Sequence, residues 1–115
     1  MPLNDATLNV GAVAMQAKMT HASLHTATPN TSGSNASSAA RKAITWDTPA
    51  GGDMVATTDI LFTGGAPLGT ITHIGFWDAS TGGNFAGYVP ATGDTSFNSA
   101  GEATVTGLSI PGTAS

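Results

Sequence analysis

The sequence contains no cysteine among its 115 residues. This absence excludes disulfides, thiolate nucleophiles and cysteine-based zinc or iron–sulfur sites. Charged residues are also scarce, at 9% of the chain, whereas about 25% is typical. A surface with so little charge is covered by hydroxyls, amides and backbone. Such a surface is common among strand-and-turn proteins that pack against neighbours.

Basic residues are the scarcest charged class. The chain has Lys18, Arg41 and Lys42 against seven acidic residues, and its net charge is -4. Nucleic acid is bound by neutralising phosphates, and three basic residues form no adequate patch for that purpose. The composition therefore predicts a protein that does not bind nucleic acid.

Long apolar runs are absent as well. No run approaches the roughly 20 residues needed to cross a bilayer. The alanine-rich stretch over residues 10–17 has no basic segment before it, and Asp5 stands where a signal peptide would carry positive charge. The sequence therefore predicts neither a membrane protein nor a secretion signal.

The common catalytic and nucleotide-binding motifs are missing too. The chain contains no GxxxxGK[ST], GxGxxG, GxSxG or HExxH pattern. The spacing of the acids leaves a glycosidase-type carboxylate pair open, but Asp47, Asp53 and Asp78 lie at predicted strand ends or turns, where aspartate caps backbone groups. We predict no catalytic residue, no cofactor and no bound metal.

The three histidines are the remaining candidates for metal ligands. His21 and His25 have the spacing of a helical metal pair, but they fall in a predicted strand, where they lie about 13 Å apart on one face. We expect both to have a surface or interface role. His73 lies inside the most apolar predicted strand, which favours a structural histidine with satisfied hydrogen bonds.

Periodicity predicts one helix, over residues 4–19. Asn4 or Asp5 can cap its first free N–H groups. Leu8, Ala12, Met15 and Met19 recur at three- and four-residue steps and form one apolar stripe. A helix this short needs tertiary docking, and we expect the stripe to cover the protein's own sheet.

The rest of the chain has the period of strands. Alternating segments separated by Gly/Pro breakers predict strands at residues 20–26, 43–47, 54–62, 70–78, 84–89 and 102–110. Residues 84–89 are expected to pair with 70–78 across the turn at 80–83. The fold class is all-β, as a small β-sandwich or partly closed barrel with one N-terminal helix packed on it. Residues 1–115 form a single domain, with a β-domain over 20–110 and a tail at 111–115.

A polar loop over residues 28–39 interrupts the strands. It has almost no apolar residue over 30–38, so we expect it to be exposed, outside the core, and to bind neighbouring subunits. The arginine beside it suits a carboxylate on a neighbouring subunit or in the turn of Asp47. The candidate interface residues are Asn30, Ser34, Asn35, Arg41 and Lys42.

A second group of residues is expected to determine the fold. Tryptophans in alternating strands are more often core than carbohydrate platforms, Gly75 lies where a side chain would crowd a crossing element, and the turn glycines fix a hairpin. The fold-determining residues are Trp46, Ile74, Gly75, Phe76, Trp77, Gly82 and Gly83.

Two parts of the chain carry a family resemblance. The first comprises SLHTATP at residues 23–29 and ARKAITW at 40–46, and the second is ITHIGFWDASTGGNFAG at residues 71–87. Together they resemble small structural proteins of phages of actinobacteria and other bacteria, labelled minor tail, tail fibre or head decoration proteins. The resemblance covers residues 19–110. The loop departs from it, because relatives often carry a Gly-Gly-containing stretch before the arginine.

The resemblance implies a non-enzymatic virion protein that is assembled in the host cytoplasm. The leading hypothesis is a capsid decoration or head-accessory protein, with a minor tail or tail-fibre component as the alternative. The partners implied are the major capsid protein or tail proteins, and further copies of the chain in a homo-oligomer. A second alternative is a carbohydrate- or receptor-binding module that uses Trp46 or Trp77 to stack on a host-surface glycan.

Overall fold

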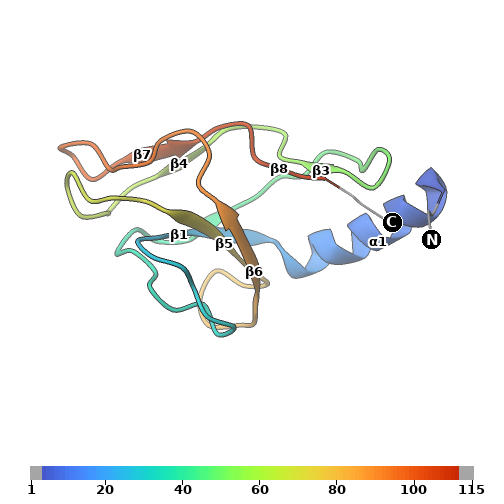
Figure 1. Ribbon diagram of the computed structural model, residues 1–115, viewed down its shortest axis with the longest axis horizontal. Helices are drawn as coiled ribbons and strands as arrows, with labels where there is room; N and C mark the ends of the chain where they lie inside the picture. The colour runs from blue at the N-terminus through green and yellow to red at the C-terminus, as the bar shows by residue number, and fades with distance from the viewer. Residues whose placement is uncertain (1–3, 112–115) are drawn as a thin grey trace.

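The N-terminal segment forms the single helix of the computed structural model, which describes residues 4–111. Helix α1 (Asp5–Lys18) begins after Asn4, whose side-chain Oδ1 accepts a hydrogen bond from Thr7 N at 2.9 Å. This cap satisfies one of the free N–H groups of the first turn. In Figure 1 the helix extends away from the strands at one end of the molecule. No described helix is long and apolar enough to cross a membrane.

The largest sheet has four antiparallel strands in the order β2-β1-β5-β6. These are β1 (His21–His25), β2 (Lys42–Ala43), β5 (His73–Trp77) and β6 (Phe85–Pro90). Strand β5 lies between β1 and β6, and the β5–β6 hairpin has the predicted pairing, with Ile74 opposite Val89. The most apolar predicted strand is therefore an inner strand of this sheet.

Two long predicted strands are each divided into two short ones. Residues 54–62 form β3 (Met54–Val55) and β4 (Ile60–Phe62), and residues 102–110 form β7 (Ala103–Val105) and β8 (Ser109–Ile110). β3 pairs with β8 and β4 pairs with β7, as two separate antiparallel ribbons. The second break coincides with Gly107, whose φ of 62° lies in the left-handed region that strands do not use.

The main core lies between the four-stranded sheet and the two ribbons, which Figure 1 shows above it. One face of the sheet buries two cross-strand pairs of the β1–β5 ladder. These pairs are Ala22 with Phe76 and Leu24 with Ile74. The ribbons and their connections contribute the buried side chains of Met54, Ile60, Phe62, Ile71, Phe97, Ala103, Val105 and Leu108. Burying these apolar side chains is the dominant favourable contribution to folding.

The fold is the small β-rich domain with one N-terminal helix that the sequence predicts. The sheets are antiparallel and do not close into a barrel, so the partly closed barrel is not formed. The helix packs on the β-domain: Ala12 is fully buried in the core cluster, Gln16 Nε2 donates to Asp47 O, and Asn9 Oδ1 accepts from Gly52 N. These two hydrogen bonds fix it to the segment before β3. The predicted tail, apart from residue 111, lies outside the described residues.

Candidate interaction surface

The second face of the four-stranded sheet is covered by the polar loop, residues 28–39. Gly33 in this loop is buried, and a side chain added there would collide with the rings of Trp77 and Phe85. The backbone of the loop thus lies directly on the Trp77 ring. The prediction that the loop lies outside the core is therefore wrong at Gly33. This glycine contacts the buried Trp77 ring through its backbone, without any polar side chain.

Beneath the loop, a chain of hydrogen bonds joins three buried side chains. Trp77 Nε1 donates to Ser23 Oγ at 2.8 Å, Ser23 Oγ is 2.6 Å from His25 Nε2, and His25 Nδ1 is 2.8 Å from Ser34 O. A carbonyl can only accept, so Nδ1 carries the proton and Nε2 accepts from the Ser23 hydroxyl. Every donor in this chain has an acceptor, which is the condition for burying polar groups.

The serine–histidine pair in this chain has the atoms of a nucleophile and a base. However, Ser23 and His25 are 3% and 0% exposed, and the Ser23 oxygen already accepts from Trp77. No substrate can reach that oxygen without opening the loop. The pair therefore fixes the loop to the sheet. The expectation of a surface or interface role is wrong for His25, because the loop covers the face on which it lies.

Arg41 holds the β5–β6 hairpin against this cluster. Its Nη1 donates to Ala79 O at 3.0 Å and to Gly82 O at 2.7 Å. Its guanidinium carbon lies 3.5 Å from the centroid of the Trp77 ring, within the range of a cation–π contact. The guanidinium therefore binds carbonyl groups of its own chain, and not the turn of Asp47 that the sequence suggested.

The other candidate interface residues lie in two places. Asn30 Oδ1 accepts from Ser32 N, Ser32 Oγ and Ser34 N, and Asn35 Nδ2 donates to Thr28 O. The structure thus brings Asn30, Ser34 and Asn35 together, where their polar groups shape the loop. Lys42 is separate from them and pairs with Ala22 at the edge of the sheet. Their role in an interface stays a prediction.

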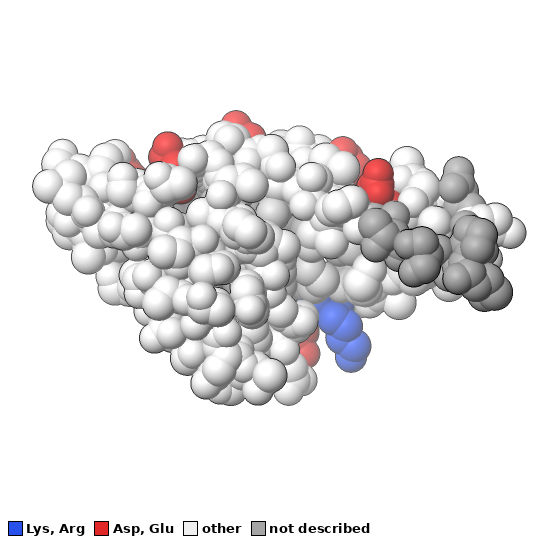
Figure 2. Space-filling model, in the orientation of Figure 1, with Lys and Arg blue, Asp and Glu red and all other residues white. Residues whose placement is uncertain are grey.

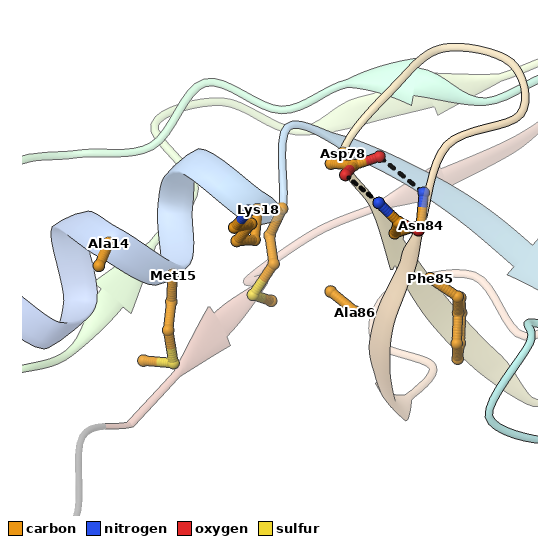
Figure 3. Close-up of a pocket in the computed structure, with 8 residues that line it drawn as sticks. Ala14, Met15, Lys18, Asp78, Asn84, Phe85 and Ala86 are labelled. Carbon is orange, nitrogen blue, oxygen red and sulfur yellow. Dashed lines mark hydrogen bonds between the residues drawn. The ribbon is translucent and has the colours of Figure 1, made fainter.

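The hairpin turn is also held by its own side chains. Gly82 and Gly83 have φ of 61° and 72°, which favours glycine. Asp78 Oδ1 accepts from Asn84 N at 2.7 Å, and Oδ2 accepts from Asn84 Nδ2 at 3.1 Å, as Figure 3 shows. These hydrogen bonds stabilise the carboxylate and lower the pKa of Asp78. Asp78 is thus a turn residue, in line with its predicted capping role.

A groove of about 530 Å³ separates this hairpin from the end of α1 (Figure 3). Met15 and Ala14 line its helix side, Phe85 and Ala86 line its strand side, and Asp78, Asn84, Lys18 and Met19 complete it. The groove is mainly apolar with one polar end. Met15, which the sequence placed in the stripe that docks the helix, is 44% exposed here.

The outer side of α1 is a further apolar surface. Val10 and Val13 are 72% and 55% exposed, and Ala6, Ala14 and Ala17 are exposed as well. Figure 2 shows that the visible face of the molecule carries few charged side chains, and that acids lie mostly along one edge. This surface was not predicted, although Ala6, Val10, Val13 and Ala17 recur in the sequence at steps of four and three residues.

The tryptophans form no exposed platform. Trp77 is buried beneath Arg41, and Trp46 is partly buried, with its Nε1 donating to Met19 O at 2.8 Å and its ring 6.2 Å from that of Phe76. Tyr88 is 45% exposed, and its ring meets that of His73 edge-on. Trp77 is only 8% exposed and Arg41 lies over its ring, so this side chain offers no open face for a glycan in this conformation.

The titratable groups of residues 4–111 do not converge on an ion site. No group of three or more His, Asp or Glu side chains in this range could hold a metal ion. The acids instead bond to nearby backbone and hydroxyl groups: Thr57 Oγ1 donates to Asp47 Oδ1, and Thr104 N donates to Asp94 Oδ2. Hydrogen bonds of this kind hold loops and turns in place.

Comparison with known proteins decides the family. A sequence model of the family described as "Podophage GP4 fiber I protein gp80" matches residues 3–111. The chain belongs to this fiber I family. The resemblance to phage structural proteins is therefore confirmed, and membership places the chain among phage fibre proteins of the virion. No curated protein and no solved structure matches it significantly.

The buried histidine makes a testable prediction about the stability of this fiber I protein. Burial lowers the pKa of His25, because the charged imidazolium is poorly solvated beneath the loop. The unfolded chain then binds a proton more readily than the folded protein does. We expect the contribution of His25 to the free energy of unfolding to be constant above neutral pH and to fall as the pH drops through about 6.5, by at most about 1.4 kcal/mol per pH unit.

Urea denaturation between neutral and mildly acidic pH measures this dependence. His25→Gln should lose the part of the slope that belongs to this group, whereas His73→Gln, at a partly exposed site, should keep it. An unchanged slope in His25→Gln would contradict the assignment of the pH dependence to the buried ring.

Proposed function

We propose that this fiber I family member is a structural component of a phage tail fibre, without catalytic activity, in preference to a head decoration protein. The match of the family over residues 3–111 carries the proposal, because the family is described as a fibre protein. The partners are then other proteins of the virion.

The shape of the molecule supports this role. Its extents are 46 × 25 × 22 Å, and α1 projects from one end (Figure 1). An elongated unit with a helix at one end can make separate contacts at its two ends, as a fibre component requires. The β-domain supplies the compact end, where the loop and the hairpin are tied to the sheet through Trp77 and Arg41.

The polar side chains support a structural role without catalysis. Ser23, His25 and Arg41 are the groups that could otherwise do chemistry, and each forms hydrogen bonds within the fold. The sparsely charged surface is also suited to packing, because covering amides and hydroxyls whose hydrogen bonds can be remade with a partner costs less than burying charged groups.

Labelling of intact particles tests the location. A gold-conjugated antibody against this chain should mark the tail region in negative-stain images, and the chain should be far less abundant than the major capsid protein in purified particles. An antibody against the major capsid protein is the matched control, since it must mark the head. Labelling spread over the head, with copy number close to that of the capsid protein, would establish decoration instead.

A further inference from the structure

The two faces of the four-stranded sheet are covered by different parts of the chain. In Figure 1 the ribbons of the main core lie above the sheet and the polar loop, residues 28–39, lies below it. The tip of the loop contacts the sheet through the backbone of Gly33, on the Trp77 ring, and through the carbonyl of Ser34, at His25. Because the main core lies on the opposite face, the loop can separate from the sheet while the main core stays closed.

The far end of the loop is attached to β1 by backbone hydrogen bonds. Thr26 N donates to Asn35 O at 3.0 Å, and Ser37 N donates to Leu24 O at 2.7 Å. Inside the loop, the side chain of Asn30 accepts hydrogen bonds from two backbone N–H groups. The loop therefore has internal hydrogen bonds of its own and a small number of attachments to the sheet.

The hydrogen bonds beneath the loop fit a neutral imidazole. The two ends of the chain are fixed, because Trp77 Nε1 can only donate and Ser34 O can only accept. Between them, the Ser23 hydroxyl must donate to His25 Nε2. A proton on Nε2 would point a second donor at the Ser23 oxygen and would deprive its hydroxyl hydrogen of the acceptor that it has now. Protonation of His25 therefore disrupts a buried hydrogen bond, which is costly.

The charges around His25 also oppose a positive imidazole. Arg41 lies beside it and His73 lies opposite it on β5, and both lower the pKa of His25 in addition to the effect of burial. The polar loop has no titratable side chain, and Tyr88, the titratable residue of β6, contacts His73 instead. Asp78, just after β5, is hydrogen-bonded within its own turn. No carboxylate in residues 4–111 thus balances a charge on His25.

We propose that residues 28–39 form a cover that neutral His25 holds closed, and that protonation of His25 releases this cover from the sheet before the main core opens. A buried neutral histidine makes unfolding depend on pH wherever it lies, but its position beneath a loop makes this opening local. Release of the loop lets water solvate the imidazolium. Since the open state binds the proton more readily, the open fraction should rise as the pH falls below about 6.5, by up to about tenfold per pH unit.

Amide hydrogen exchange of the full chain, followed by NMR between neutral and mildly acidic pH, tests the proposal. Protection factors are compared, because they correct for the pH dependence of the chemical exchange itself. The amides of Thr26 and Ser37 report release of the loop, and those of Ile71 and Phe97, which donate to Thr95 O and Gly69 O, report opening of the main core. We expect Thr26 and Ser37 to be less protected than Ile71 and Phe97 at every pH. Their protection should fall by up to about tenfold per pH unit below about 6.5.

His25→Gln separates protonation from other effects of acid. The glutamine carboxamide offers one donor and one acceptor in place of the two ring nitrogens, but it does not titrate. Protection of Thr26 and Ser37 should therefore lose its pH dependence in this variant. His73→Gln is the matched control, because it makes the same change at the position opposite His25, and it should keep the dependence.

The comparison within the native chain decides the question even where His25→Gln does not fold. Loop amides as strongly protected as those of Ile71 and Phe97 at every pH would show that the cover opens only with the whole protein. Protection of Thr26 and Ser37 that stays constant over this pH range, or that falls as steeply in a folded His25→Gln variant, would equally overturn the proposal.

Discussion

Replacing Trp77 by alanine is expected to lower the free energy of unfolding by about 4 kcal/mol, within the range measured for buried tryptophans. The ring is 8% exposed and lies between the guanidinium of Arg41, the backbone of Gly33 and the ring of Phe85, whose centroid is 5.0 Å away. Its loss leaves a cavity on the loop-covered face and removes the donor to Ser23. Chemical denaturation of the variant measures the change.

Trp77→Phe separates the effect of the cavity from the effect of the lost hydrogen bond to Ser23. Phenylalanine fills much of the cavity but has no N–H group, so it should cost clearly less than alanine while still leaving the Ser23 oxygen without its donor. Leu61→Ala, at a side chain that is 52% exposed on β4, should change stability little. A loss below about 1 kcal/mol for Trp77→Ala would mean that the loop does not depend on this ring.

Gly75→Ala is expected to cost about 3 kcal/mol, at the upper end of the usual penalty for overpacking. A Cβ at this position would collide with the His25 ring, and it would also lie 2.8 Å from Phe85 Cε1 and 2.9 Å from Ser23 Oγ. Gly75 lies on β5 directly beneath the hydrogen-bonded cluster. The His25 ring and the Ser23 hydroxyl cannot withdraw without breaking the hydrogen bonds between Ser23, His25 and Ser34.

Gly11→Ala is the matched control for that substitution. A Cβ at Gly11 would meet nothing within 4 Å, and alanine in the interior of a helix gains about 1 kcal/mol over glycine. The same chemical change should therefore stabilise the protein in α1 and destabilise it in β5. Equal effects at the two positions, measured by denaturation, would contradict the packing that we describe beneath the loop.

The local pattern of the sequence was sufficient for the elements that depend on neighbouring residues. The cap of Asn4, the period of α1 and the glycines of the β5–β6 turn act over a few residues, so the helix and this hairpin were predicted close to their observed positions. The long strands over 54–62 and 102–110 were not, because their division depends on which ribbon each half joins, with Met54 opposite Ile110 and Ile60 opposite Val105.

The candidate site was harder to predict than the fold. Alternation in β1 placed His25 on the side opposite Leu24, which is correct, but a period of two says nothing about what covers each side. The polar composition of residues 30–38 indicated a solvated loop. The loop contacts the buried cluster through Gly33 and through the carbonyl of Ser34. Because the backbone makes both contacts, the polarity of the loop's side chains does not indicate them.

The sequence alone determined that this protein is a small β-rich domain with one N-terminal helix, and its resemblance to phage structural proteins was enough to indicate the family. These properties follow from composition, local periodicity and recognisable segments. Tertiary structure decided that the polar loop covers the sheet, that Arg41 binds the hairpin, and that Val10 and Val13 of α1 are exposed. Each of these depends on contacts between residues far apart in the chain, such as the 54 positions that separate Ser23 from Trp77, and local pattern carries no information at that range.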